Sequence, residues 1–371
     1  MYYTGLEIIK NHGSIMKKHN FSSGPAILPQ SVMEEAAKAV VDWNDMGLSI
    51  LEISHRSKEF TAVMDEAQQL TKELLHIGED YSVLFLTGGA SSQFYMTAMN
   101  LLGTAETACY IDTGNWSAKA IDEAKHFGNV KVVASSKDEA YTYIPKEFTL
   151  PTDAKYLHIT TNNTVQGTQF HQIPDVSIPI VADMSSDIFS RPIDIEKYGL
   201  IYAGAQKNMG PAGATMVIVR KDLVGKIQRQ IPTMLDYATH IKKGSMFNTP
   251  PVFPVFVSML TLRWLKAQGG VENMEAVNVA KAKMLYEEID RNSCFRGRVK
   301  KEDRSLMNVT FFAETPELEK AFLAVCEQEN ISGIKGYRTI GGFRASIYNA
   351  MPVSSVEHLV TVMREFEATQ G

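Results

Sequence analysis

Seven short apolar runs in the first two-thirds of the chain constrain its fold more than any other feature. Several are apolar at every position instead of alternating with polar residues, which is typical of strands that helices cover on both faces. Helical patterns at residues 92–102 and 117–126 lie between some of the runs. The sequence therefore predicts an α/β fold with a mostly parallel, seven-stranded sheet. The predicted strands are residues 83–86, 108–111, 130–133, 156–159, 178–182, 200–203 and 215–219.

The pattern changes after residue 219. A loop rich in Pro, Gly and Asn precedes a predicted helix that ends before Gly269 and Gly270. The remainder predicts a smaller α+β domain, with helices at 271–291, 315–330 and 355–369 and strands at 308–312 and 344–347. We expect a large domain over residues 21–268 and a small C-terminal domain over residues 269–371. Residues 1–20 are expected to be an N-terminal extension that need not be ordered, and residues 1–15 are expected to carry no chemistry.

Composition excludes several classes of function. The chain has 371 residues with 37 Lys and Arg against 42 Asp and Glu, and no long basic run, so we expect neither a nucleic-acid nor a membrane-surface partner. No apolar run is long enough to cross a bilayer, and the first fifteen residues lack the apolar stretch of a signal peptide. Cys109, Cys294 and Cys326 match neither a zinc spacing nor a disulfide framework, so we expect a cytoplasmic protein without a metal site.

A lysine and an aspartate follow two consecutive predicted strands. Lys207 comes after the strand at 200–203, and Asp183 directly follows the strand at 178–182. Ligands of α/β proteins bind at the carboxyl ends of the strands, so the pair indicates a site at that edge of the sheet. A crowded position would lower the lysine pKa from ~10.4 towards ~7–8. Alone, Lys207 is better read as a lysine at the surface and Asp183 as a turn cap; together they are moderately specific for pyridoxal-phosphate chemistry.

Three further features near predicted strand ends are weak signals. The glycine-rich turn at residues 87–93 precedes a helix whose N-terminus could bind a phosphate, but it is neither a dinucleotide fingerprint nor a Walker loop, and most such turns bind nothing. Trp116 could stack on a flat ring, although core packing is at least as good an interpretation. Thr164 could donate to a ring hydroxyl, although a solvated turn is the simpler reading.

Seven motifs together resemble the phosphoserine aminotransferases, which are class-V aminotransferases of the pyridoxal-phosphate fold type I. The resemblance extends from about Phe21 to the end of the chain, and the later motifs are highly specific. It implies a homodimer with shared active sites, which transfers the amino group of glutamate to a phosphorylated 2-oxo acid, 3-phosphohydroxypyruvate. Serine synthesis and, in many bacteria, pyridoxine synthesis are its implied pathways. The motifs are FSSGP (21–25), SHRSKEF (54–60), TGGASSQF (87–94), SSDIFSRPID (185–194), YAGAQKN (202–208), GSMFNTPP (244–251) and GGFRASIYNAMP (341–352).

The resemblance also implies roles for individual residues. Lys207 matches the lysine that forms the Schiff base with pyridoxal 5'-phosphate, and Asp183 matches the partner of its ring nitrogen. Further cofactor contacts are implied for Ala90, Ser91, Trp116, Thr164 and Gln206, and for Asn248 and Thr249 of the neighbouring subunit. Arg344 matches the arginine for the substrate carboxylate, and His55, Arg56 and Arg338 match a cluster for the substrate phosphate. Guanidinium groups suit both anions, which they bind through paired hydrogen bonds.

The chain departs from some family members at two positions, and alternative functions remain open at this point. Ser91 stands where some members have an arginine, and Tyr337 where others have a histidine, so the affinity for phosphate groups is in question. A cysteine desulfurase needs a mobile cysteine, whereas Cys326 lies in a helical pattern. An alanine–glyoxylate type of transaminase is a further alternative within the same fold. A catalytically silent pyridoxal-phosphate protein would lack the substrate arginines, which this chain has.

Overall fold

The large sheet contains all seven strands that the sequence predicts. The structure is a computed structural model that describes residues 18–370. Residues 1–17 of the expected N-terminal extension lie outside the described residues. The strand order is β2-β8-β7-β6-β5-β3-β4, with β8 antiparallel to both of its neighbours and the other pairs parallel. The strands are β2 (Tyr81–Leu86), β3 (Thr107–Asp112), β4 (Asn129–Ser135), β5 (Ala154–Thr160), β6 (Ile180–Asp183), β7 (Tyr198–Gly204) and β8 (Thr215–Arg220).

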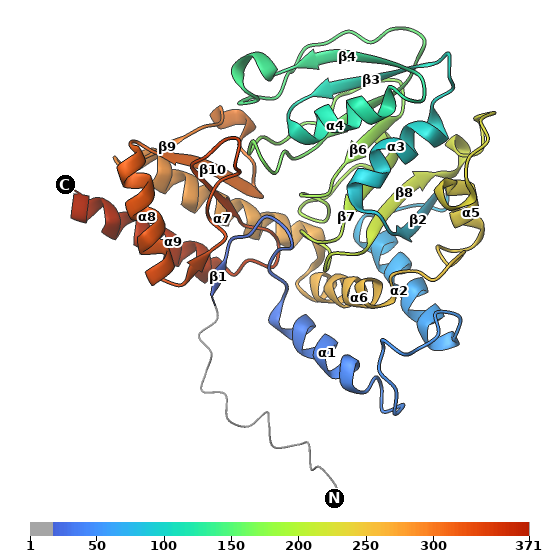
Figure 1. Cartoon of the computed structure of the whole chain (residues 1–371), viewed down its shortest axis with the longest axis horizontal. Helices are drawn as coiled ribbons and strands as arrows, with labels where there is room; N and C mark the ends of the chain where they lie inside the picture. The colour runs from blue at the N-terminus through green and yellow to red at the C-terminus, as the bar shows by residue number, and fades with distance from the viewer. Residues whose placement is uncertain (1–17, 371) are drawn as a thin grey trace, which may run out of the picture.

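Helices cover both faces of this sheet, as the runs of apolar residues predict (Figure 1). Within β7, Ile201 and Ala203 belong to one apolar core, whereas Leu200 and Tyr202 belong to the other. The first core includes α1 (Gln30–Val41), α2 (Lys58–Leu74) and α6 (Val252–Ala267), and the second includes α3 (Gly89–Leu101), α4 (Asn115–Ala124) and α5 (Tyr237–Lys242).

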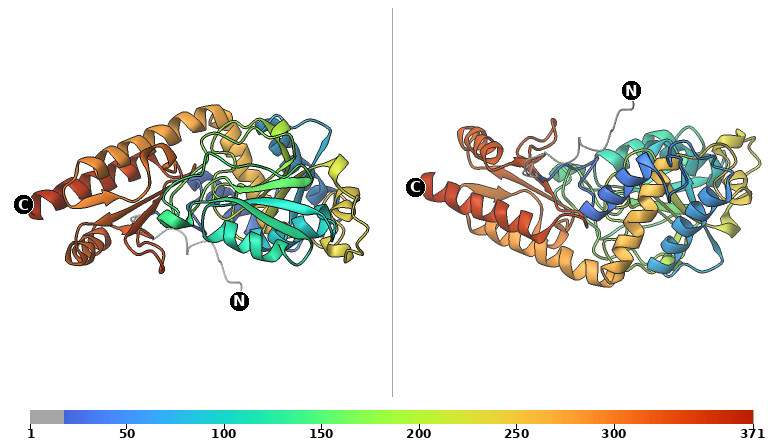
Figure 2. Two further views of the ribbon diagram at one scale, coloured as in Figure 1. Left: turned by 90° about the horizontal axis from the view of Figure 1, so that it is seen from above. Right: turned by 90° about the horizontal axis from the view of Figure 1, so that it is seen from below.

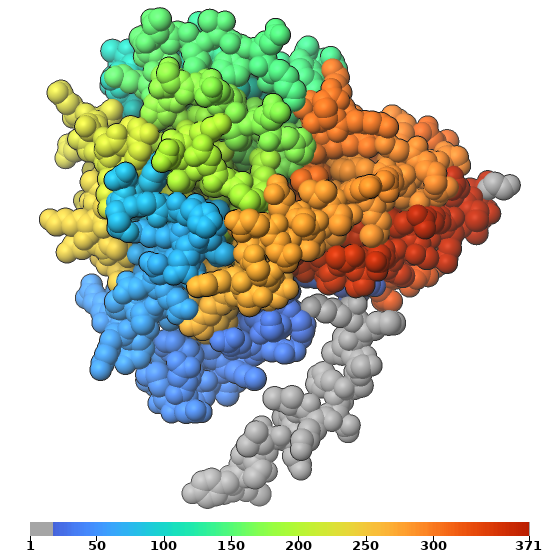
Figure 3. Space-filling view, turned by 180° about the vertical axis from the view of Figure 1, so that it is seen from behind, coloured from blue at the N-terminus to red at the C-terminus, as the bar shows by residue number. Residues whose placement is uncertain are grey.

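A second, antiparallel sheet lies to one side of the large sheet and its helices (Figure 2). Its strand order is β12-β10-β9, and a third apolar core joins it to three helices. Seen from behind, these elements form one end of the molecule (Figure 3). The strands are β9 (Phe295–Gly297), β10 (Asn308–Ala313) and β12 (Phe343–Ser346), and the helices are α7 (Gly270–Arg291), α8 (Pro316–Gln328) and α9 (Val353–Gln370).

The start of the described chain packs against these later elements. Strand β1 (His19–Asn20) pairs in parallel with β11 (Ile331–Ser332), so two residues of the expected extension are in a strand. Phe21 and Ile27 are buried in the third core. The division of the chain near Gly269 stays a prediction. Short 3-10 helices complete the fold at Lys137–Glu139, Ile195–Lys197, Lys221–Leu223, Thr233–Leu235 and Lys301–Asp303.

The strand register brings the candidate site residues to one edge of the large sheet. In the parallel trio β5, β6 and β7, Thr160 pairs with Asp183, and Asp183 pairs with Tyr202. Lys207 lies in the turn that follows β7. The carboxyl ends of parallel strands are the usual position of ligand sites in α/β proteins.

Candidate active site

Asp183 and Lys207 line the same cavity at the carboxyl edge of the sheet, as the sequence predicts. Asp183 is the last residue of β6, and its Oδ1 accepts a hydrogen bond of 2.9 Å from the backbone N–H of Ser185. The half-buried Lys207 donates from Nζ to Thr164 Oγ1 over 2.7 Å. The cavity opens to solvent, and the empty space in it, open solvent included, is about 540 Å³.

Burial shifts the pKa values of both groups towards their neutral forms. It lowers the pKa of Lys207 to about 8, although the charge of Asp183 acts in the opposite direction. It raises the pKa of Asp183, although the charge of Lys207 and the hydrogen bond from Ser185 counteract it. The amine can therefore lose its proton near neutral pH, as a proton-transfer group requires.

The N-terminus of α3 forms one wall of the cavity. Gly89, Ala90 and Ser91 lie in its first turn and line the cavity. The chain enters the helix through Gly88 and Gly89, whose φ angles are +95° and +68°, a conformation that glycine adopts at little cost. Free backbone N–H groups in the first turn of a helix favour an anion such as a phosphate group.

Trp116 and Gln206 line the same cavity, and unpartnered polar atoms point to a missing ligand. Trp116 lies in the first turn of α4, and its buried Nε1 has no hydrogen-bond partner within residues 18–370. The buried Oγ1 of Thr160, also in the cavity wall, is likewise without a partner in that part of the chain. Buried polar groups are normally satisfied. An anion site, a buried carboxylate, an amine and a flat aromatic side chain fit pyridoxal phosphate.

Arg344 reaches the edge of this site from the second sheet. It lies in β12, paired with Thr310 of β10, and its side chain is largely buried. One Nη donates to Ser23 Oγ over 2.6 Å, and the other donates to the backbone oxygen of Thr164 over 3.4 Å. Thr164 is also the partner of Lys207, so an amine and a guanidinium group converge on one residue. Burial lowers the pKa of Arg344, but a guanidinium group stays charged at neutral pH.

The other predicted residues do not line the cavity around Lys207. His55 is half-buried, and its Nε2 has no partner among residues 18–370. Arg56 and Arg338 are exposed, and no ion pair joins either to the rest of the described chain. Tyr337 lines a small pocket with Arg344, whereas Ser91 is in the main cavity wall.

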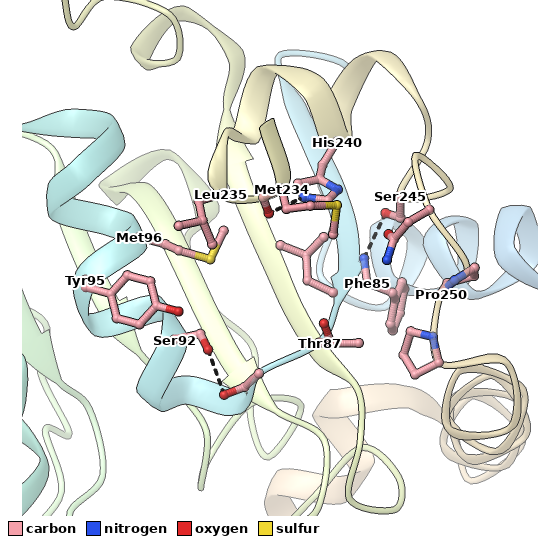
Figure 4. Close-up of a pocket in the computed structure, with 14 residues that line it drawn as sticks. Phe85, Thr87, Ser92, Tyr95, Met96, Met234, Leu235, His240, Ser245 and Pro250 are labelled. Atoms are coloured by element: carbon pink, nitrogen blue, oxygen red, sulfur yellow. Dashed lines mark hydrogen bonds between the residues drawn. The ribbon is translucent and has the colours of Figure 1, made fainter. Parts of the chain in front are cut away.

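Asn248 and Thr249 are exposed, and Asn248 lines a different cavity. Figure 4 shows this cavity with others of its lining residues labelled, Ser92 and Ser245 among them. This second cavity shares the N-terminal turn of α3 with the first one, because Gly88 and Ser92 line it. Ser245 fixes the loop that carries Asn248, since its Oγ accepts a hydrogen bond of 2.9 Å from the backbone N–H of Phe85. Asn248 and Thr249 are therefore exposed near the N-terminal turn of α3 in their own chain, the turn that favours a phosphate group.

Several residues of the site were missed in the sequence. Ser23 accepts from Arg344, and Asn162 donates to Ser186 Oγ over 2.9 Å and to Asn308 Oδ1 over 2.7 Å. The sequence alone does not show that Ser23 and Asn162 belong to the site, because their hydrogen-bond partners Arg344 and Asn308 are far away in the chain. Cavity-lining residues that were not predicted are Phe94, Thr160, Asn162, Ser185 and Ser186.

The fold and the cavity together define a pyridoxal-phosphate enzyme of fold type I. The chain belongs to the class-V aminotransferase family, whose sequence profile matches residues 18–359. A phosphoserine aminotransferase of Bacteroides fragilis is 59% identical over 354 residues, which are 95% of this chain and 99% of that protein.

Solved structures agree with this assignment. The phosphoserine aminotransferase of Bacillus circulans subsp. alkalophilus superimposes with a TM-score of 0.93 at 46% identity, covering 96% of this chain and 99% of the other. The pyridoxal-phosphate-bound phosphoserine aminotransferase of Trichomonas vaginalis gives a TM-score of 0.90 at 38% identity, covering 94% and 100%. The similarity therefore spans both sheets and the whole candidate site.

Proposed function

We propose that this chain is a phosphoserine aminotransferase, which exchanges an amino group between glutamate and 3-phosphohydroxypyruvate. The products are 2-oxoglutarate and O-phospho-L-serine, an intermediate of serine biosynthesis. The observation that carries the proposal is the 59% identity to a phosphoserine aminotransferase over 95% of the chain. The same site chemistry would suit 4-phosphohydroxy-L-threonine of pyridoxine biosynthesis, which also carries an amino group, a carboxylate and a phosphate.

Pyridoxal 5'-phosphate is the cofactor, and the residues of the cavity are suited to hold it. The first turn of α3, with Ala90 and Ser91, would bind the cofactor phosphate together with Gln206. Trp116 would stack on the ring, and Thr164 would bond the ring hydroxyl. When bound, the cofactor draws electrons from the substrate α-carbon, provided that its ring nitrogen stays protonated.

Asp183 would keep the ring nitrogen of the cofactor protonated, and Lys207 would remove the proton from the substrate α-carbon. Asp183 would hold the proton on the ring nitrogen, because a buried carboxylate stabilises a buried positive charge. Lys207 would attach the cofactor between turnovers. Released by the amino substrate, its amine would act as a general base on the α-hydrogen, for which a pKa of about 8 is suitable.

Arginine residues would recognise the two substrate anions. Arg344 would bind the α-carboxylate, since its guanidinium group lies beside Thr164, the partner of Lys207. His55, Arg56 and Arg338 would bind the substrate phosphate. A charge-assisted hydrogen bond contributes about 1.5–3 kcal/mol, so the phosphate cluster would distinguish phosphoserine from serine.

A homodimer would complete the site. Asn248 and Thr249 are exposed on their own chain, and the cavity that Asn248 lines adjoins the turn of α3 that faces Lys207. Met234 and Phe247, large apolar residues in the flanking loops, are also exposed. Covering such side chains favours association. Asn248 and Thr249 of each subunit would then bind the cofactor phosphate of the other.

A cytoplasmic location belongs to the same proposal, since Cys109, Cys294 and Cys326 are free thiols. No helix within residues 18–370 is long and apolar enough to cross a membrane. A desulfurase would need an accessible cysteine, whereas Cys326 is buried in α8 and burial raises its pKa to about 12. That thiol is a packing residue.

An absorption spectrum of the purified holoenzyme tests the proposal. Adding L-phosphoserine without a keto acid should convert the pyridoxal-form band to the pyridoxamine form, and L-serine at equal concentration should leave the spectrum unchanged. The matched variant Arg338→Gln should keep the band and lose most of the preference for phosphoserine. A visible band that does not respond to phosphoserine would refute the substrate assignment and leave the family intact.

A further inference from the structure

Lys281 is a fully buried lysine that the proposed chemistry does not use. It lies in the middle of α7, on the face where Met274, Ala282 and Leu285 are packed into the core. Its Nζ donates to three backbone oxygens, those of Tyr348 at 2.7 Å, Ile347 at 3.0 Å and Met351 at 3.3 Å. In its protonated form the amine has three N–H donors and no acceptor, so the three carbonyl groups match the ammonium form, although burial lowers the pKa of Lys281 to about 7.

This arrangement is not an ion pair. No carboxylate within residues 18–370 forms a salt bridge with Lys281, and the side chain is 0% exposed. A buried lysine is costly unless it is well bonded. The three carbonyl groups belong to the turn at 347–351, directly after β12. Lys281 therefore fixes the backbone of this turn.

The turn is linked to Arg344 through a short chain of hydrogen bonds. The hydroxyl of Tyr348 donates to the backbone oxygen of Ser23 over 2.8 Å. The Oγ of the same Ser23 accepts from Arg344 over 2.6 Å. Tyr348 OH also accepts from Asn308 Nδ2 over 3.0 Å. The turn that Lys281 holds thus sets the position of the partner of Arg344, as well as the end of its strand.

A second set of bonds joins the turn to the region of Lys207. The backbone N–H of Asn349 donates to Oδ1 of Asn208, the neighbour of Lys207, over 3.0 Å. Asn349 Nδ2 donates to the backbone oxygen of Phe189 over 2.9 Å, and Asn278 of α7 donates to Asn349 Oδ1 over 2.8 Å. The turn at 347–351 therefore contacts both the second sheet and the loops after β6 and β7.

We propose that Lys281 is a positioning residue for substrate recognition: by clamping the turn at 347–351, it places Arg344 beside Lys207. The inference rests on the proposed role of Arg344 in binding the substrate carboxylate. Lys281 touches neither substrate nor cofactor and acts only through Arg344. The turn is held by the hydrogen bonds that Lys281 Nζ donates and not by the volume of the side chain.

The test compares Lys281→Met with Lys283→Met in the holoenzyme. Methionine retains most of the side-chain length but removes all three N–H donors; of the three carbonyl groups, that of Tyr348 keeps the backbone N–H of Met351 at 2.9 Å. Lys283 is an exposed residue of the same helix. The probe is α-methyl-L-glutamate, which has the α-carboxylate but no α-hydrogen, and calorimetry gives its dissociation constant. We expect Lys281→Met to weaken its binding between about tenfold and 100-fold, and Lys283→Met to leave it unchanged.

Controls separate positioning from general damage. The dissociation constant of the cofactor should change by less than about threefold, and Lys281→Arg, which keeps the donors, should restore part of the probe affinity. In an Arg344→Ala background, Lys281→Met should cause no further loss, because contacts in one network are not additive. If Lys281→Met does not fold, Tyr348→Phe, which breaks the next link of the chain, should give the same pattern.

Two results would overturn the inference in distinguishable ways. If Lys281→Met weakened probe binding by the same factor with and without Arg344, or lowered only the melting temperature, Lys281 would have a structural role alone. If Arg344→Ala itself left the affinity for the probe unchanged, the proposed role of Arg344 would fail first, and the role of Lys281 with it.

Discussion

At the scale of single residues, the pKa of Lys207 predicts how the protein takes up its cofactor. The amine must be unprotonated to react with the cofactor aldehyde, and burial lowers its pKa to about 8. The rate of uptake by the apoprotein should therefore rise with pH and level off above about 8. Asp183→Asn removes a charge that raises this pKa, so the midpoint should move to lower pH.

Stopped-flow absorbance at a series of pH values measures the rate of cofactor uptake, and so gives the midpoint of its pH dependence for the unaltered protein and for Asp183→Asn. Asp122→Asn, an exposed replacement on α4, is the matched control and should leave the midpoint in place. A midpoint near the ordinary lysine value of ~10.4 would show that the amine is not desolvated. A shift of the midpoint to higher pH in Asp183→Asn would show that the charge of Asp183 does not raise the pKa of Lys207.

At the scale of elements, the N-terminal turn of α3 depends on Gly88. Its φ is +95°, and a Cβ atom there would lie 2.1 Å from Ser92 Oγ, the atom that donates to the Gly88 carbonyl. Gly88→Ala should therefore displace the turn and weaken cofactor binding by at least about tenfold, since backbone strain of this kind costs about 1–3 kcal/mol. Equilibrium dialysis of the cofactor and thermal unfolding measure the two effects.

Gly47→Ala, in the loop after α1 and outside the lining of the cavity around Lys207, is the control for backbone strain alone. Gly47 also has a positive φ, of +68°, but a Cβ atom there would meet no atom within 4 Å. We expect it to lower stability less than Gly88→Ala and to keep most of the cofactor affinity. Equal losses of affinity in the two variants would mean that the contact with Ser92 is unimportant.

Sequence periodicity predicted most of the elements and the centre of the site. Apolar runs identified every strand of the large sheet, and Asp183 and Lys207 could be paired because each follows a strand. Strand β6 begins at Ile180 and not at 178, since Pro179 has no N–H to donate to the sheet. Lys281 was not predicted, because a lysine in a helical pattern suggests an exposed face. Only the folded chain shows that Asn278, Lys281 and Glu288 occupy the buried face of α7.

Contacts between distant segments account for the rest. Ser23 and Arg344 are separated by 321 positions, and Arg344 and Thr164 by 180. Local sequence cannot give the distance between such residues, because it depends on how the second sheet packs beside the first. The family resemblance assigned Arg344 to the site, and the structure places it next to the partner of Lys207. The proposed phosphate cluster of His55, Arg56 and Arg338 stays a prediction.

At the scale of the whole molecule, the proposed dimer makes each active site dependent on two chains. Lys207 would come from one subunit, and Asn248 and Thr249 from the other. A Lys207→Ala chain should be inactive, and a chain with both Asn248→Ala and Thr249→Ala should bind the cofactor poorly. In a hybrid of the two variants, one of the two sites would contain only unaltered residues, because each chain supplies what the other lacks.

Mixing the variants after mild dissociation therefore tests shared sites directly. Random pairing of equal amounts produces half hybrids, each with one intact site, so about a quarter of the wild-type activity should return. The mixture assayed before subunit exchange is the control and should remain inactive. If no activity returned although mass spectrometry detected hybrid dimers, Asn248 and Thr249 would serve the site of their own chain. If the mixture were already active before exchange, the Asn248→Ala, Thr249→Ala chain would be active by itself, and the site would not need these two residues.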